Sequence, residues 1–167
     1  MAITRTPMVD DDGTGTTGTV INNAWKQELY NQIDAALPAA TTWTTVPYSA
    51  SNFSASSGTW TVGAPNVTTF EYVVMGKVMI INFYIASTSV SATPATLRIL
   101  IPGGYLSARE TRGVGQANDA GTATVPGLLR VIPGGNLLEC YKTMAGGNWA
   151  VATNNTNVAG QLVFSIQ

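Results

Sequence analysis

The amino-acid sequence changes character near residue 38. Before that point, an acidic, Gly- and Thr-rich stretch (residues 6–19) precedes one amphipathic segment. After it, Thr-, Val- and Gly-rich segments with strand-like alternation continue to the end of the sequence. Residues 6–19 carry too little apolar surface to offset the entropy lost on ordering their backbone, so they cannot fold alone. The sequence therefore predicts two parts: residues 1–38, an extended docking arm with one short helix, and residues 39–167, a self-sufficient β domain.

The helix is predicted between residues 21 and 37, where apolar residues recur every four positions and so share one face. These residues are Ile21, Trp25, Leu29, Ile33 and Leu37. Asn22 or Asn23 can cap its start, and Pro38 ends it, because a residue that precedes proline is pushed out of helical geometry. A helix of about 15 residues is marginal alone, so we expect it to need a partner.

Apolar and acidic residues of the arm form the predicted contact with that partner. Residues 1–37 hold two basic and five acidic side chains, whereas residues 38–167 hold six basic and four acidic ones. This division favours a basic surface on the partner or on a sister subunit, and a solvated acidic loop is the alternative. The predicted docking residues are Met8, Val9, Asp10, Asp11, Asp12, Ile21, Trp25 and Leu29.

Nine or ten short strands are predicted after residue 41. The segments are 59–62, 68–75, 78–86, 95–101, 111–116, 122–132, 137–143, 149–152 and 160–166. Gly76 and Lys77 form the turn of a hairpin, and Pro126 makes its segment an edge strand or two pieces, because proline donates no ladder hydrogen bond. This spacing predicts a mainly β fold, an antiparallel β-sandwich of jelly-roll type.

A short repeat predicts two equivalent corners of this sandwich. The segment 98–104 (RILIPGG) is echoed by 130–135 (RVIPGG), and in each an apolar strand ends in a proline-led turn with glycine behind it. A binding role for these loops is the other interpretation, since loops often carry function.

The composition argues against catalysis. The chain has no histidine and one cysteine, Cys140, which removes histidine-based triads, histidine zinc sites and thiolate metal clusters. A hydrolase would need Glu71 and Glu139 to meet across a cleft, which nothing in the sequence favours. Asp10–Asp12 lack the alternating ligand pattern of a calcium loop, so we predict no metal and no cofactor. We expect a non-enzymatic protein.

The best candidates for ligand contact are Tyr105, Arg109, Arg112 and Tyr141, which lie in or beside predicted loops. An exposed tyrosine with nearby arginines suits a host surface glycan, whereas most other aromatic residues, such as Trp60, Phe83 and Phe164, are expected in the core. A formal net charge of −1 offers no basic field for nucleic acid. No apolar run is long enough to cross a bilayer, and no signal peptide is recognisable.

The N-terminal sequence resembles that of tailed-bacteriophage structural proteins. The resemblance rests on TRTP (residues 4–7), VDD (9–11), GTG (13–15) and GTVINNAWK (18–26). Residues 60–104 are similar to small β-sandwich modules of phage tail fibres and head fibres. The resemblance implies a virion surface protein, trimeric, made in the host cytoplasm and docked on capsid or tail structural proteins. The lack of a heptad or collagen-like shaft favours a head decoration, cement or head-fibre protein, and a tail-fibre or receptor-binding module is the alternative.

Overall fold

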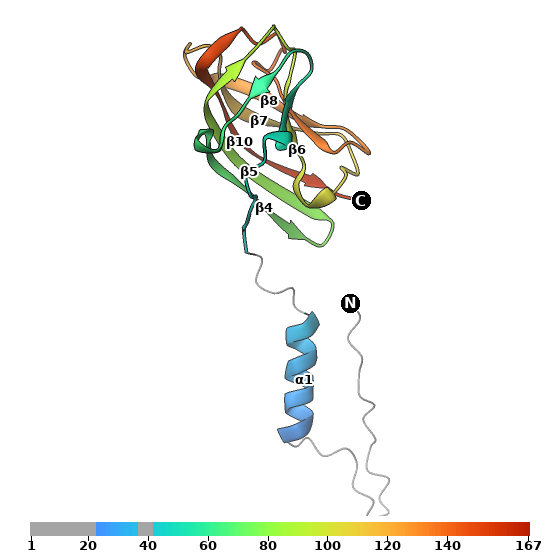
Figure 1. Cartoon of the computed structure of the whole chain (residues 1–167). Helices are drawn as coiled ribbons and strands as arrows, with labels where there is room; N and C mark the ends of the chain where they lie inside the picture. The colour runs from blue at the N-terminus through green and yellow to red at the C-terminus, as the bar shows by residue number, and fades with distance from the viewer. Residues whose placement is uncertain (1–22, 37–41) are drawn as a thin grey trace, which may run out of the picture. The chain divides into compact units, whose positions relative to one another are not determined.

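The computed structural model describes residues 23–36 and 42–167 (Figure 1). The chain divides into two units, residues 1–42 and residues 43–167, and the second is called the β domain below. The predicted mainly β fold with one preceding helix is confirmed.

The helix α1 spans Asn23–Ala36. Its polar side chains hydrogen-bond one turn apart: Gln27 Nε2 donates to Asn31 Oδ1 over 3.1 Å, and Gln32 Nε2 donates to Glu28 Oε1 over 3.1 Å. On the apolar side, Leu29 is half-buried and Ile33 is exposed. The predicted helix is therefore present over the described part of its range.

Ten antiparallel strands form one sheet in the described residues. They are β1 (Thr44–Thr45), β2 (Phe53–Ala55), β3 (Trp60–Thr61), β4 (Val67–Met75), β5 (Val78–Val90), β6 (Leu97–Leu100), β7 (Thr111–Asn118), β8 (Val125–Val131), β9 (Leu137–Cys140) and β10 (Ala152–Ser165). The order across the sheet is β1-β4-β5-β10-β7-β8-β9-β6-β2, and β3 pairs with β5. The hairpin of β4 and β5 turns at Gly76 and Lys77 as predicted, with a left-handed φ of 61° at Gly76.

The sheet curls so that its far end returns to its beginning. Phe53 of β2 packs edge-on against Trp60 of β3 at 5.5 Å between ring centroids and lies 6.0 Å from Phe70 of β4. The two faces of the sandwich thus belong to one curled sheet that encloses a single core. Trp60, Phe83 and Phe164 lie in this core, as predicted.

Alternation along β5 places one face in the core. Met79, Ile81, Phe83 and Ile85 are buried, and the residues between them are less buried or exposed. Ser87 then adopts a φ of 55°, and the β-bulge at this point adds a residue to β5. After the bulge the buried residues are therefore the even-numbered Thr88 and Val90 instead of odd-numbered ones. The strand therefore continues to Val90, four residues beyond the predicted end.

Two predicted strands need correction. The strand that contains Pro126 is neither an edge strand nor two pieces: β8 lies between β7 and β9. Proline is tolerated because β9 pairs only with Leu129 and Arg130, so Pro126 lies beyond its reach. The predicted strand 149–152 is also wrong. Trp149 is buried outside any strand, and its indole nitrogen donates to Cys140 O over 3.2 Å.

The two proline-led corners lie at the same end of the sheet. Gly103 and Gly134 both take left-handed φ values, 74° and 70°, as their turns require. Ser107, fully buried, joins the corners: its amide donates to Gly135 O, and it accepts from the Gly134 amide. The matching backbone conformations of the two turns therefore agree with the interpretation of the repeat as two equivalent corners.

Candidate functional site

The predicted docking residues fall mainly outside the described part of the chain. Met8, Val9, Asp10, Asp11, Asp12 and Ile21 all lie outside it. Trp25 belongs to α1, but its side chain also lies outside the described residues. Leu29 is half-buried, and its helix neighbours Tyr30 and Ile33 are 58% and 37% exposed. Within its described part, α1 thus presents apolar surface.

Tyr105 is not the exposed platform predicted for the ligand loop. Its ring is partly buried and packs against the core. It also lies against Gly103, where an added Cβ would come within 2.7 Å of the ring. Arg109 is exposed, whereas Arg112 is paired with Glu110 at 2.8 Å.

Tyr141 belongs to a charged row across three neighbouring strands. Glu139 of β9 lies opposite Arg130 of β8 and opposite Arg98 of β6, with nitrogen–oxygen distances of 2.7 and 3.5 Å. The Arg130 guanidinium also stacks over the Tyr141 ring at 5.2 Å. The hydrogen bonds that Arg130 donates to Glu139 raise the pKa of Arg130, and burial followed by the Glu139 charge raises the pKa of Tyr141.

In the charged row two arginines share one glutamate, and these ion pairs tie β6, β9 and β8 together. Arg112 lies opposite Arg130 on β7, so the structure brings Arg112 and Tyr141 to this row but leaves Tyr105 elsewhere. Glu71 is not a partner for Glu139, whose carboxylate is held by Arg98 and Arg130. Glu71 instead accepts from Asn82 Nδ2 over 2.8 Å.

The remaining titratable groups inside the β domain form no reactive cluster. Burial raises the pKa of the Cys140 thiol, which therefore stays protonated and unreactive near neutral pH. Asp119 accepts from the Ala150 amide and pairs with Lys142 at 3.1 Å. Among the residues that the structure describes, no three histidine, cysteine or acidic side chains gather in a way that could hold a metal ion.

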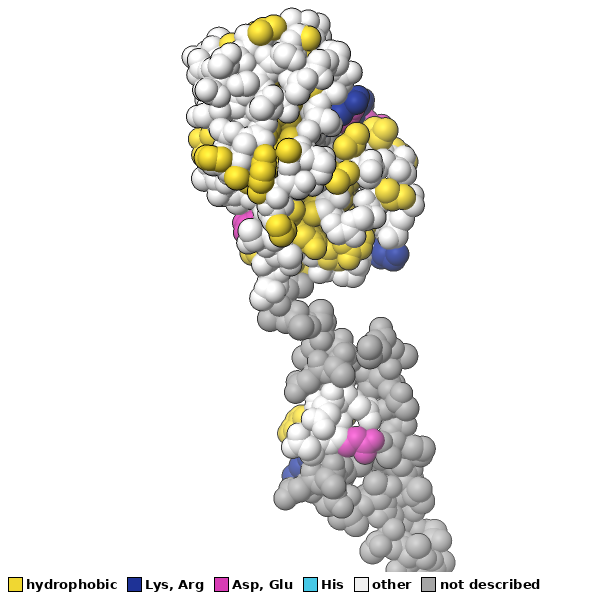
Figure 2. Space-filling view, in the orientation of Figure 1, with side chains coloured by type: hydrophobic (Ala, Val, Ile, Leu, Met, Phe, Trp, Pro, Cys, Tyr) yellow, Lys and Arg dark blue, Asp and Glu magenta, His cyan; other side chains and the backbone are white. Residues whose placement is uncertain are grey.

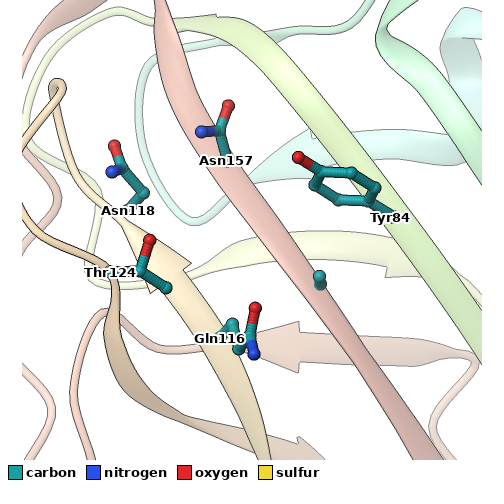
Figure 3. A pocket seen from close by; sticks show the side chains of 6 residues that line it. Tyr84, Gln116, Asn118, Thr124 and Asn157 are labelled. Carbon is teal, nitrogen blue, oxygen red and sulfur yellow. The ribbon is translucent and has the colours of Figure 1, made fainter.

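The main surface hollow, which sequence reasoning missed, lies on the outer face of β5, β10 and β7. Two adjoining depressions of about 140 and about 640 Å³ share Tyr84, Gln116 and Ala159. We call them together the amide groove. Figure 3 shows Tyr84 on one side of β10, and Gln116, Asn118 and Thr124 on the other. Its remaining side chains include Asn157, Asn82 and Gln161.

Strand register builds the groove in cross-strand rows. Ala159 lies opposite both Tyr84 and Gln116, and Asn157 lies opposite Asn118. The alternate residues Phe83, Ala117 and Val158 point into the core and are buried. Each groove residue is therefore held on the outer face by a buried neighbour in its own strand.

Several polar groups of the groove have unused hydrogen-bonding capacity. Within the described part of the chain, the side-chain amides of Gln116 and Gln161 and the Tyr84 hydroxyl form no hydrogen bond. Asn157 Oδ1 accepts from the Ser87 amide over 2.6 Å, which leaves its amide nitrogen available. Asn118 donates to Thr122 O, and its own Oδ1 has no partner among the described residues.

An apolar patch lies on the same outer face, toward the β4–β5 turn. Met75 and Val163 are 44% and 49% exposed, and they are joined by Val73, Val78 and Ile80. Register places Val73 opposite Ile80 and Ile80 opposite Val163. These five residues, named the apolar patch, are uncharged and lie on β4, β5 and β10; Val73 is buried, and the other four are partly or largely exposed.

The comparisons with known proteins do not assign the chain to a family. Neither the protein-family models nor the curated proteins nor the solved structures give a match. In the described residues, no helix combines the length and the apolar character needed to cross a membrane.

Proposed function

We propose that the chain is a non-enzymatic structural protein of a bacteriophage particle, which docks through residues 1–38 and displays the β domain on the virion surface. The observation that supports this most is the division of the chain into two units of different kind. The β domain encloses a core of its own, whereas α1 leaves Tyr30 and Ile33 exposed. A short helix with exposed apolar side chains gains stability from a partner surface.

The partner is a capsid or tail structural protein, and the role is that of a decoration, cement or head-fibre protein. The resemblance of residues 4–34 to phage structural leaders supports this assignment. The surface of the β domain fits a display role, because charged side chains are sparse on the face drawn in Figure 2. Only 10% of the whole chain is charged.

Copies of the chain associate with one another, with a trimer as the expected form. The apolar patch supports contact between copies, because its five side chains carry no charge and two of them are about half exposed. Val78, Ile80 and Val163 lie on the interior strands β5 and β10, so a second copy seated on them would contact side chains rather than extend the sheet. Equivalent patches would then meet around a symmetry axis.

Deletion of residues 1–21 tests the docking role. The β domain should keep its cooperative unfolding, measured by tryptophan fluorescence, while particles should lose the protein, measured as copy number by quantitative mass spectrometry. A finer test is Ile33→Asp, which places a charge on the exposed apolar side of α1.

Val151→Asp is the matched control, because Val151 is 63% exposed in the β domain and away from α1 in sequence. We expect Ile33→Asp to lower copy number at least tenfold and Val151→Asp to leave it unchanged. Normal copy number in both the deletion and Ile33→Asp would refute docking through residues 1–38.

Recognition of a host surface glycan, as in a tail-fibre or receptor-binding module, is the second candidate function. The amide groove is the observation that favours it. Its uncharged polar lining does not match a nucleic-acid or metal site.

A further inference from the structure

We infer that the amide groove binds a neutral carbohydrate. This inference rests on the second candidate function, recognition, and not on docking through residues 1–38. It also moves the ligand site away from the predicted loop, because Tyr105 packs against the core and Arg112 is already paired.

The lining of the groove selects for an uncharged ligand. None of the side chains that line its two depressions is acidic or basic. Glu71 lies just beyond the lining, and its carboxylate accepts from the Asn82 amide. An acidic sugar or a charged peptide would lose its hydration without gaining a counter-charge, whereas a neutral ligand would not incur that cost.

Amide side chains match the hydroxyl groups of a sugar. Each carboxamide offers two donors and one acceptor in a plane, so it can bond two neighbouring hydroxyls at once. The side chains of Gln116 and Gln161 are exposed and make no hydrogen bond within the described residues, and Asn157 has a free side-chain amide nitrogen. The neighbouring strands β7 and β10 thus present amide donors and acceptors at a spacing of about 4.8 Å between strands, close to the length of one sugar unit.

Tyr84 supplies the apolar contact that a sugar ring also requires. Its side chain is 43% exposed and lies on the outer face of β5, opposite the small Ala159. The C–H face of a pyranose can pack on such a ring while its hydroxyls reach the neighbouring amides. The lack of a large side chain at Ala159 leaves room beside the ring (Figure 3).

Two side chains of the groove are held in place before any ligand binds. Asn157 Oδ1 is anchored by the Ser87 amide at the β5 bulge, and Asn118 is anchored by Thr122 O. Asn118 Oδ1 remains without a partner in the described residues, beside the wall formed by Thr124. A preorganised site loses less side-chain entropy on binding than a flexible one.

The position of the groove argues against an extended peptide as its ligand. β5, β10 and β7 are all interior strands, and over residues 158–160 β10 is paired with β5 on one side and with β7 on the other. A peptide could not add to the sheet as a strand there. The polar side chains offered there are amides, one threonine hydroxyl and one tyrosine, and they lie beside Ala159 and the exposed Val114.

The test uses the full chain on an array of neutral oligosaccharides, built from glucose, galactose, N-acetylglucosamine or rhamnose, beside sialylated and uronic-acid glycans. Affinity for a soluble hit is then measured by NMR titration. We expect a neutral glycan to bind, and Tyr84→Ala and Gln116→Ala each to weaken it at least tenfold. Tyr84→Phe should retain most of the affinity, because it keeps the ring.

Matched controls separate this site from the docking unit. Tyr30→Ala removes an exposed tyrosine from α1, and Asn148→Ala removes an exposed amide outside the groove. Both should leave glycan affinity unchanged. Conversely, Tyr84→Ala should leave copy number on particles unchanged, so failure of glycan binding is distinguishable from failure of docking.

Several results would overturn the inference. These are an array without any neutral hit, binding confined to acidic glycans, or full affinity in Tyr84→Ala and Gln116→Ala. Loss of binding only in Tyr105→Ala would assign the ligand to the corner loop instead. A change of oligomer mass in Tyr84→Ala, measured by light scattering, would make the groove a contact between copies.

Discussion

Alkaline pH should destabilise the β domain through one thiol. Cys140 lies in β9 with 1% of its surface exposed, and burial raises its pKa far above the ordinary value of 9.0. In the unfolded chain the thiol ionises above about pH 9, while in the folded chain it keeps its proton. The folded state then binds more protons than the unfolded state, so stability is full below the unfolded pKa and falls as pH rises.

The size of the effect follows from the same linkage. Each pH unit above the unfolded pKa removes about 1.4 kcal/mol of unfolding free energy per group. Between about pH 8 and about pH 10.5 the thiol alone should remove about 2 kcal/mol. Tyr141 acts in the same direction, since its pKa is also raised, but its partial exposure makes its share smaller.

Urea unfolding at a series of pH values measures this loss, with the buried Trp60 and Trp149 as fluorescent reporters. Cys140→Ala is the comparison, because it removes the thiol and leaves every other titrating group in place. The wild-type chain should lose about 2 kcal/mol more than Cys140→Ala across that range. Equal losses in the two proteins would refute the argument that burial keeps the thiol protonated.

Three further substitutions test particular contacts. The Thr88 hydroxyl bridges the indole nitrogen of Trp60 and the carbonyl of Thr156, at 2.8 Å from each. Thr88→Val leaves both groups without that partner, so urea unfolding should show a loss of about 2 kcal/mol of unfolding free energy. A larger loss in Thr88→Ser, which keeps the hydroxyl, would contradict this. Glu139→Gln removes the charge that two arginines share and should lower the unfolding free energy by about 1–3 kcal/mol in the same measurement. Glu110 forms an exposed ion pair with Arg112, so Glu110→Gln should lower it by less than about 0.5 kcal/mol. Val163→Asp puts a charge into the apolar patch and should shift the mass seen by light scattering toward the monomer; an unchanged mass would exclude the patch as the contact between copies.

Local patterns predicted those parts of the fold that depend on neighbouring residues in sequence. The alternation of Ile81, Phe83 and Ile85 gave the buried face of β5, and Gly76 marked its turn. The bulge at Ser87 left no such signal, because serine at a positive φ is held there by Asn157, a residue from β10. Long-range hydrogen bonds of this kind cannot be seen in a local pattern.

Strand β10 shows the same limit. The sequence predicts residues 149–152 and 160–166 as separate strands and leaves the residues between them outside both. In the structure, β10 runs from Ala152 to Ser165. The Asn154 side chain accepts from the Ser89 hydroxyl, and the Asn154 backbone amide donates to that hydroxyl. The polar residues outside the predicted strands thus tie β10 to β5.

The candidate site was missed for a related reason. Alternation alone places Tyr84, Gln116 and Gln161 on outward faces of their strands, but it does not say which strands are neighbours. β10 inserts between β5 and β7 although it is last in the chain, and this insertion brings the three side chains onto one surface. For Tyr105 the prediction of an exposed ring was wrong. A tyrosine beside two glycines suggests exposure, but in the structure its ring fills the space that Gly103 leaves open.

Because side chains alternate between the two faces of a strand, residues of the groove and residues of the core are neighbours in the sequence of the β domain. Phe83 and Tyr84 are neighbours in sequence, yet the first is 1% exposed in the core and the second is 43% exposed in the groove. The same division holds for Ala117 and Gln116 on β7. A substitution in the groove therefore changes the ligand surface while the core beneath it keeps its packing. Under the proposed function, the β domain could acquire a different ligand by exchange of outward residues, while residues 1–38, which we propose to dock, belong to the other unit and need not change.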